Sequence, residues 1–141
     1  MNKIYWICII DRSGATVVRY ENQVPGNNNG NSPVWSHILY ALRSIANTLK
    51  ENEIGGLEIG NYKFFLCKEK KSNYLFILKS NRDADSLIIT PFLLELKNKF
   101  LVKIKGPNNL PTEGKIQLLN SFREDIRQLI KEYNHDFTTK F

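Results

Sequence analysis

Histidine and cysteine are scarce in this chain of 141 residues, which contains two of each. Cys8 and Cys67 lie inside apolar runs and share no CxxC spacing, so we expect buried free thiols that behave as small hydrophobic side chains. Neither a disulfide framework nor a zinc site is therefore expected. His37 and His135 lack the spacing of a metal site or a nucleophilic triad; we expect His37 to be a partly exposed helix residue and His135 to face solvent.

Long apolar runs and phosphate-binding glycine motifs are also absent. Residues 4–10 are apolar but too short to span a bilayer, and no small-residue cleavage site follows them. The second residue is Asn2, where myristoylation requires glycine. Gly55, Gly56 and Gly60 form neither a GxGxxG nor a Walker-type motif. The chain is therefore expected to be cytoplasmic, with contact to a membrane surface from outside as an option.

A catalytic constellation is hard to assemble from this sequence. Asp83 and Asp85 could bind a metal or carry out acid–base chemistry. At a strand-to-helix junction, however, capping of free helix N–H groups is the simpler role for such residues. No nucleophile and base stand in a recognisable pattern, so we expect neither an enzyme nor a cofactor.

The charge is unbalanced in favour of basic residues: 20 Lys and Arg against 14 Asp and Glu give a net charge of +6. This balance favours anionic partners, such as nucleic acid, acidic lipid or an acidic protein surface. The same charge equally serves solubility alone, and both interpretations stand. A length of 141 residues with 42% hydrophobic residues fits a single domain over residues 1–141.

The N-terminal part predicts a hairpin followed by a helix. Residues 4–10 are apolar on both alternating faces, which is typical of a central strand, and residues 15–20 form a second β-rich run after a short turn. Residues 22–31 are rich in asparagine and predict a mobile loop. A helix is predicted from residue 33 to about residue 51. Its buried face is formed by Val34, Ile38, Ala41, Leu42, Ile45 and Leu49.

Three more strands are predicted after this helix, over residues 57–60, 62–68 and 74–78. The last of them is again apolar on both faces and so predicts a second central strand. If the two central strands lie side by side, the strands are arranged in the order 2-1-5-4-3. We expect the first and last strands to pair in parallel, which makes the sheet mixed.

Two helices are expected to close the chain. The first has two alternative starts: Thr90 and Pro91 cap and begin it, or Asp85 caps a longer helix kinked at Pro91. After a break at residues 106–111, the last helix is predicted over residues 113–133, and residues 134–141 form a C-terminal tail. The predicted fold is α+β with element order β-β-α-β-β-β-α-α. One helix covers one sheet face and two helices cover the other.

This order resembles the longin fold, the SNARE-like domain of vesicle-trafficking proteins, and is similar to TRAPP small subunits and clathrin adaptor sigma subunits. The likeness is carried by the strand–turn–strand segment of residues 9–20 with its Asp-Arg-Ser-Gly turn, by residues 57–64, and by residues 74–77. The resemblance implies a protein-binding subunit of a trafficking, tethering or small-GTPase-regulatory assembly. It further implies a homo- or hetero-oligomer that contacts a longin or roadblock domain or a Ras-like GTPase. A basic nucleic-acid-binding module is the alternative, although no RNP-like motif or zinc finger is present.

Two groups of residues are the candidate sites. Trp35, Tyr40 and Arg43 of the first predicted helix are candidates for partner binding; Trp35 could equally pack under the Asn-rich loop. A lysine cluster near the end of the second predicted helix is a candidate for contact with a membrane or another anion. It could equally complement the dipole of that helix. Its members are Lys97, Lys99, Lys103 and Lys105.

Overall fold

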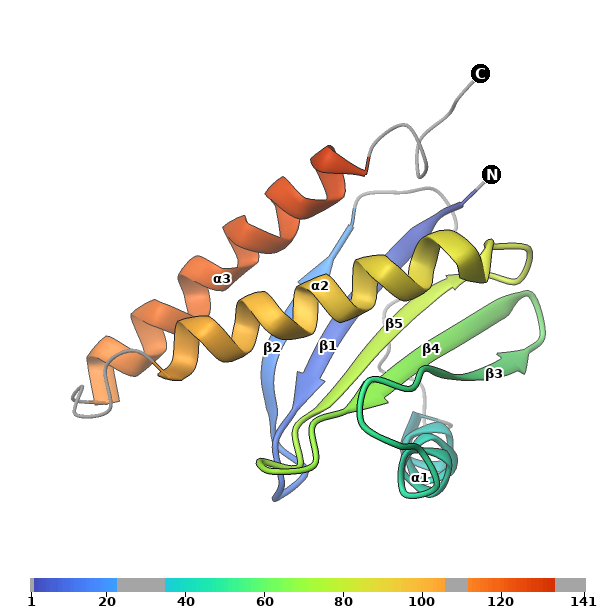
Figure 1. Ribbon diagram of the computed structural model, residues 1–141, viewed down its shortest axis with the longest axis horizontal. Coiled ribbons are helices and arrows are strands. Elements are labelled where there is room, and N and C mark those ends of the chain that lie inside the picture. The colour runs from blue at the N-terminus through green and yellow to red at the C-terminus, as the bar shows by residue number, and fades with distance from the viewer. Residues whose placement is uncertain (1, 23–34, 106–111, 134–141) are drawn as a thin grey trace.

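A computed structural model describes residues 2–22, 35–105 and 112–133 of the chain. Most of the loop predicted at 22–31, the break at 106–111, His135 and the tail at 134–141 lie outside the described residues. The described part is a five-stranded sheet with helices on both faces (Figure 1). Its elements are β1 (Ile4–Ile10), β2 (Thr16–Glu21), α1 (Trp35–Ala46), β3 (Gly55–Ile59), β4 (Tyr62–Lys68), β5 (Leu75–Asn81), α2 (Ser86–Lys105) and α3 (Thr112–Glu132).

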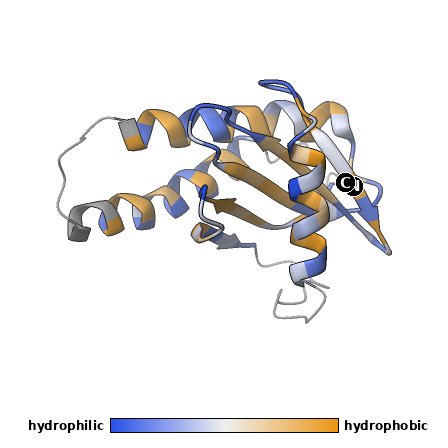
Figure 2. Ribbon diagram, turned by 90° about the horizontal axis from the view of Figure 1, so that it is seen from below, coloured by the Kyte–Doolittle hydropathy of each residue, from blue (hydrophilic) through white to orange (hydrophobic). Residues whose placement is uncertain are grey.

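The predicted fold class and strand order are confirmed. The strands run in the order β2-β1-β5-β4-β3, and the two doubly apolar strands β1 and β5 lie next to each other at the centre. Every residue of β1 is buried, as is all of β5 except its last residue. The hydrophobic character of these strands is visible in Figure 2. The architecture is that of a longin-like α+β domain.

The predicted parallel pairing of the first and last strands is wrong, because β1 and β5 pair antiparallel. The sheet is therefore antiparallel throughout, not mixed. The cause is the connection that contains α1. Helix α1 carries the chain back to the end of the sheet at which β2 began, so β3 runs in the same direction as β2. The chain then reverses direction at the β3–β4 turn and again at the β4–β5 turn. Strand β5 therefore runs opposite to β1.

The two faces of the sheet carry separate hydrophobic cores. Alternate residues of β1 point to opposite faces, so Ile7 and Ile9 join the core under α2 and α3, whereas Cys8 and Ile10 join the core under α1. The predicted distribution of one helix against two is confirmed. An irregularity in the β1–β5 register between Ile4 and Trp6 interrupts this alternation and places both Tyr5 and Trp6 on the α1 side.

The structure corrects one predicted helix boundary, the end of α1, and decides between the two predicted starts of α2. The helix expected to reach about residue 51 ends at Ala46, where turn hydrogen bonds from Thr48 N to Ile45 O and from Leu49 N to Ala46 O replace the helical pattern. The second helix takes the longer of its two predicted forms and contains Pro91. Asp85 caps it, since its Oδ1 accepts a hydrogen bond from Leu87 N at 2.9 Å.

Candidate functional site

The outer face of α1 presents the most exposed aromatic side chain of the described residues. Tyr40 is 76% exposed, while Leu42 and Ala46 on the opposite side of the helix are buried against the sheet. A tyrosine ring in this position offers apolar area together with a hydroxyl group, which suits a protein interface. Tyr40 is therefore accessible on the surface, and its role in partner binding stays a prediction.

Trp35, the second predicted partner-binding residue, packs inward. Its ring meets Trp6 edge-on, with centroids 5.3 Å apart, and lies 6.5 Å from the ring of Phe64. These contacts attach the first turn of α1 to the core on the α1 side. The ring is only partly accessible, and its main contacts are intramolecular.

Strand β3 is one edge of the sheet and pairs only with β4. Gly56, Glu58 and Ile59 are exposed along it, and Ile59 is a large hydrophobic residue. Gly55 lets α1 approach closely, since a Cβ atom there would lie 2.9 Å from Ile45 Cγ2. The open edge and α1 are thus neighbouring surfaces (Figure 1). An edge strand of this kind can accept a further strand from a partner.

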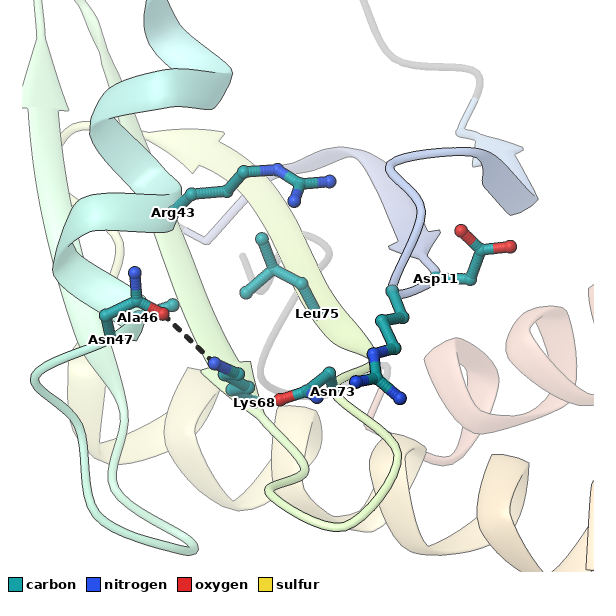
Figure 3. Close-up of a pocket in the computed structure, with 8 residues that line it drawn as sticks. Asp11, Arg43, Ala46, Asn47, Lys68, Asn73 and Leu75 are labelled. Carbon is teal, nitrogen blue, oxygen red and sulfur yellow. Dashed lines mark hydrogen bonds between the residues drawn. The ribbon is translucent and has the colours of Figure 1, made fainter.

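Arg43, the third predicted residue, lines a pocket of about 310 Å³ at the end of α1. The pocket lies between that helix, the β1–β2 turn and the β4–β5 turn, and Figure 3 shows Arg43 extending across it above Leu75. The Arg43 guanidinium approaches Gly14, where an added Cβ would be 3.1 Å from Nη2. Gly14 has φ of +95°, a conformation that favours glycine. The turn of the predicted Asp-Arg-Ser-Gly motif therefore lies directly beside the Arg43 guanidinium.

The predicted lysine cluster on α2 does not form one surface patch, and the assignment of Lys97 to membrane contact is wrong. Lys97 is 2% exposed, and its Nζ donates to Glu51 Oε1 at 2.9 Å and to Asn52 Oδ1 at 2.8 Å. Lys103 binds Asp125 of α3 at 2.6 Å. Lys99 is exposed and remains available, whereas the side chain of Lys105 is outside the described residues.

The cause of this dispersal is helix geometry. Successive residues of an α-helix are about 100° apart around the axis, so Lys97 and Lys99 leave α2 on roughly opposite sides. Closeness in the sequence therefore did not mean a shared face. The same rotation, applied to the helix that the sequence predicts, is enough to separate these two lysines.

The remaining residues considered in the sequence analysis are a helix cap, an exposed histidine and two buried thiols. Asp85 is the cap of α2, and His37 is exposed on α1. Both thiols are buried and free, and burial raises the pKa of the Cys67 thiol to about 12. Among residues 2–22, 35–105 and 112–133, no three His, Cys, Asp or Glu side chains gather as a metal site would require. None of the described helices is both long and apolar enough to cross a bilayer.

Comparison with known proteins places the fold. No family model and no curated protein matches the sequence. A chain from the solved structure of the mammalian SRP receptor superposes with a TM-score of 0.57 at 11% sequence identity, covering 96% of this chain and 98% of that one. The two chains share a fold.

The similarity to the SRP receptor chain covers 96% of this sequence and is therefore not confined to the sheet. At 11% identity it carries the fold alone. What the surfaces of α1 and β3 bind must therefore be argued from their own residues.

Proposed function

We propose that this chain is a non-catalytic, protein-binding longin-like module that serves as a subunit of a trafficking, tethering or small-GTPase-regulatory assembly. The observations that carry the proposal are the exposed Tyr40 on the outer face of α1 and the open edge of β3, the strand that α1 approaches through Ile45. The helix supplies an aromatic anchor and the edge supplies backbone donors and acceptors. The longin-like resemblance of the sequence supports the class of assembly, and the SRP receptor likeness supports the fold on which this surface is built.

The charge of the described surface favours this proposal over the nucleic-acid-binding alternative. Lys79 and Lys97 are buried, and Lys103 is engaged by Asp125. Part of the basic excess therefore acts inside the protein and is not displayed as a continuous stripe for phosphates.

The test combines oligomeric state with partner capture. Wild-type protein and Tyr40→Glu are compared by sedimentation velocity and as immobilised bait, with Leu87→Glu as the matched control on the other side of the molecule. Leu87 is 83% exposed on α2, so this control adds the same charge at an exposed hydrophobic site. We expect self-association, or retention of a longin, roadblock or Ras-like GTPase partner, that Tyr40→Glu abolishes and Leu87→Glu preserves.

Two results would count against the proposal. One is a strictly monomeric protein that retains none of these partner classes. The other is retention of nucleic acid that falls steeply with salt concentration and is indifferent to Tyr40→Glu, which would favour the alternative module.

A further inference from the structure

Three cationic side chains from three separate elements line the pocket at the end of α1. Arg12 comes from the β1–β2 turn, Arg43 from α1 and Lys68 from the end of β4. Asn47 and Asn73 add amide groups, and Ala46 and Leu75 provide apolar wall. A volume of about 310 Å³ lies at the lower end of the range of small-molecule sites, roughly 300–1,000 Å³.

The negative groups near the pocket do not neutralise these cations. Asp11 is the one carboxylate that lines it, and its Oδ1 is occupied by hydrogen bonds from Ser13 N, Ser13 Oγ and Ala15 N. Figure 3 shows the Asp11 carboxylate turned away from Lys68 and Asn47. Glu69 of the neighbouring turn accepts a hydrogen bond from Ser72 and does not line the pocket.

The carbonyl end of α1 contributes a further negative charge. A helix C-terminus is equivalent to roughly half an elementary charge. Together with the single negative charge of Asp11, it offsets about half of the three positive charges of Arg12, Arg43 and Lys68. Within the described residues, neither Arg12 nor Arg43 forms a salt bridge, and Lys68 Nζ donates to the neutral Asn47 Oδ1 at 3.0 Å. Among the described residues, the pocket therefore has a local excess of positive charge.

The chemistry of the donors selects among anions. One guanidinium fork is sufficient for a carboxylate, whereas two forks and an ammonium group around one hollow suit an anion with three outward oxygens. A phosphate monoester has such oxygens and carries between about −1.5 and −2 charges at neutral pH. We propose that this pocket binds the phosphate group of a small phosphate monoester through Arg12, Arg43 and Lys68. The site is distinct from the Tyr40 and β3 surface, so this inference does not rest on the proposed function.

The test is a titration followed by amide NMR shifts, with inorganic phosphate and glycerol 3-phosphate as probes and acetate as the carboxylate comparison. Shifts should be confined to residues 11–14, 43–47 and 68–75, and acetate should bind more weakly than either phosphate. Arg43→Gln should weaken phosphate binding by about tenfold or more, because it removes a charge-assisted hydrogen bond. Lys71 is an exposed cation of the β4–β5 turn that does not line the pocket. Lys71→Gln should therefore change the affinity for phosphate by less than about twofold.

Two further experiments distinguish a loss of binding from a loss of folding, and a lipid headgroup from a free phosphate compound. Arg43→Lys keeps the charge and loses the fork, so it should bind with intermediate affinity while its thermal midpoint matches that of Arg43→Gln. Sedimentation with phosphatidylcholine vesicles, with and without phosphatidylinositol 4-phosphate, identifies a lipid headgroup if the phosphoinositide recruits the chain and a free phosphate compound if it does not. The proposal is overturned if neither phosphate shifts the pocket amides, or if Arg43→Gln and Lys71→Gln bind phosphate equally.

Discussion

Lys97 is the residue whose role differs most from its expected one. Its ammonium group lies inside the protein and links α2 to the segment between α1 and β3 through Glu51 and Asn52. Asn52 adopts φ of 65°, a left-handed conformation that asparagine tolerates better than most residues. Lys97 therefore helps to hold the segment between α1 and β3 against α2.

Removing either partner of this ion pair should have unequal effects. Glu51→Gln keeps the buried ammonium and weakens its acceptor, so we expect the free energy of unfolding to fall by about 1–2 kcal/mol, discounted because Glu51 is 43% exposed. Lys97→Met removes the buried charge and keeps an apolar stem, so the loss should be under about 1 kcal/mol. Urea denaturation measures the free energy of unfolding of both variants. A larger loss in Lys97→Met than in Glu51→Gln would show that the buried ammonium does not depend on Glu51 in this way.

The same pair predicts a pH effect. The hydrogen bond from Lys97 holds the pKa of the Glu51 carboxyl below its ordinary value. Its contribution to stability is therefore complete above the unfolded-state pKa and is lost as the pH falls through the lowered folded-state pKa. Wild-type protein should lose more stability than Lys97→Met between neutral and acidic pH in urea titrations. Parallel pH profiles for the two proteins would rule this contribution out.

Both thiols should be inert while the protein is folded. Burial raises the pKa of Cys8, and it raises the pKa of Cys67 to about 12, so almost no thiolate is present at neutral pH. We expect no reaction with Ellman's reagent under native conditions and reaction of both thiols in denaturant. Ser36→Cys, which places a thiol on the exposed side of α1, is the positive control. Prompt labelling of native wild-type protein would contradict the burial.

At the scale of elements, the capping of α2 is open to direct test. Asp85 Oδ1 accepts from Leu87 N, so Asp85→Ala should lower the free energy of unfolding by about 1 kcal/mol. Asp83→Ala is the matched control, because it removes an exposed carboxylate two residues earlier and should change stability by less than about 0.5 kcal/mol. Equal losses in the two variants would show that charge, and not capping, is responsible.

The elements themselves were largely predictable, and the reasons are local. Strand β4 was placed at residues 62–68 without error, since a polar turn follows an apolar run. Asp85 was named as a helix cap on the same local grounds. The end of α1 was missed because Leu49 continues the helical spacing, yet it packs against the core from a turn after Ala46. Apolar periodicity alone cannot distinguish these two ways of burying one side chain.

At the scale of the whole molecule, the adjacency of β1 and β5 was predictable because both are apolar on two faces. Their relative direction was not, since it depends on how often the chain crosses the sheet between β2 and β3. The pocket at the end of α1 was also missed. Arg12, Arg43 and Lys68 are distant in the sequence, and only the folded arrangement of two turns and a helix end brings them together.

The central strands join two cores into one structure. β1 supplies Ile7 to the core under α2 and α3, and Cys8 to the core under α1. Neither core can lose this strand without exposing the apolar face of the other. We therefore expect unfolding to be a single cooperative transition, although the helices lie on opposite sides of the sheet.

Two spectroscopic probes can separate the two sides. Trp6 and Trp35 both belong to the α1 side, so fluorescence reports that core, whereas α2 and α3 contain most of the described helical residues and dominate far-UV circular dichroism. Leu42→Ala on one side and Ile89→Ala on the other remove fully buried side chains and should each lower the free energy of unfolding by about 2–5 kcal/mol. Each substitution should shift the denaturation midpoints of both probes together. A fluorescence midpoint that moves in Leu42→Ala while the dichroism midpoint stays in place would mean that the cores unfold separately, and that β1 does not couple them.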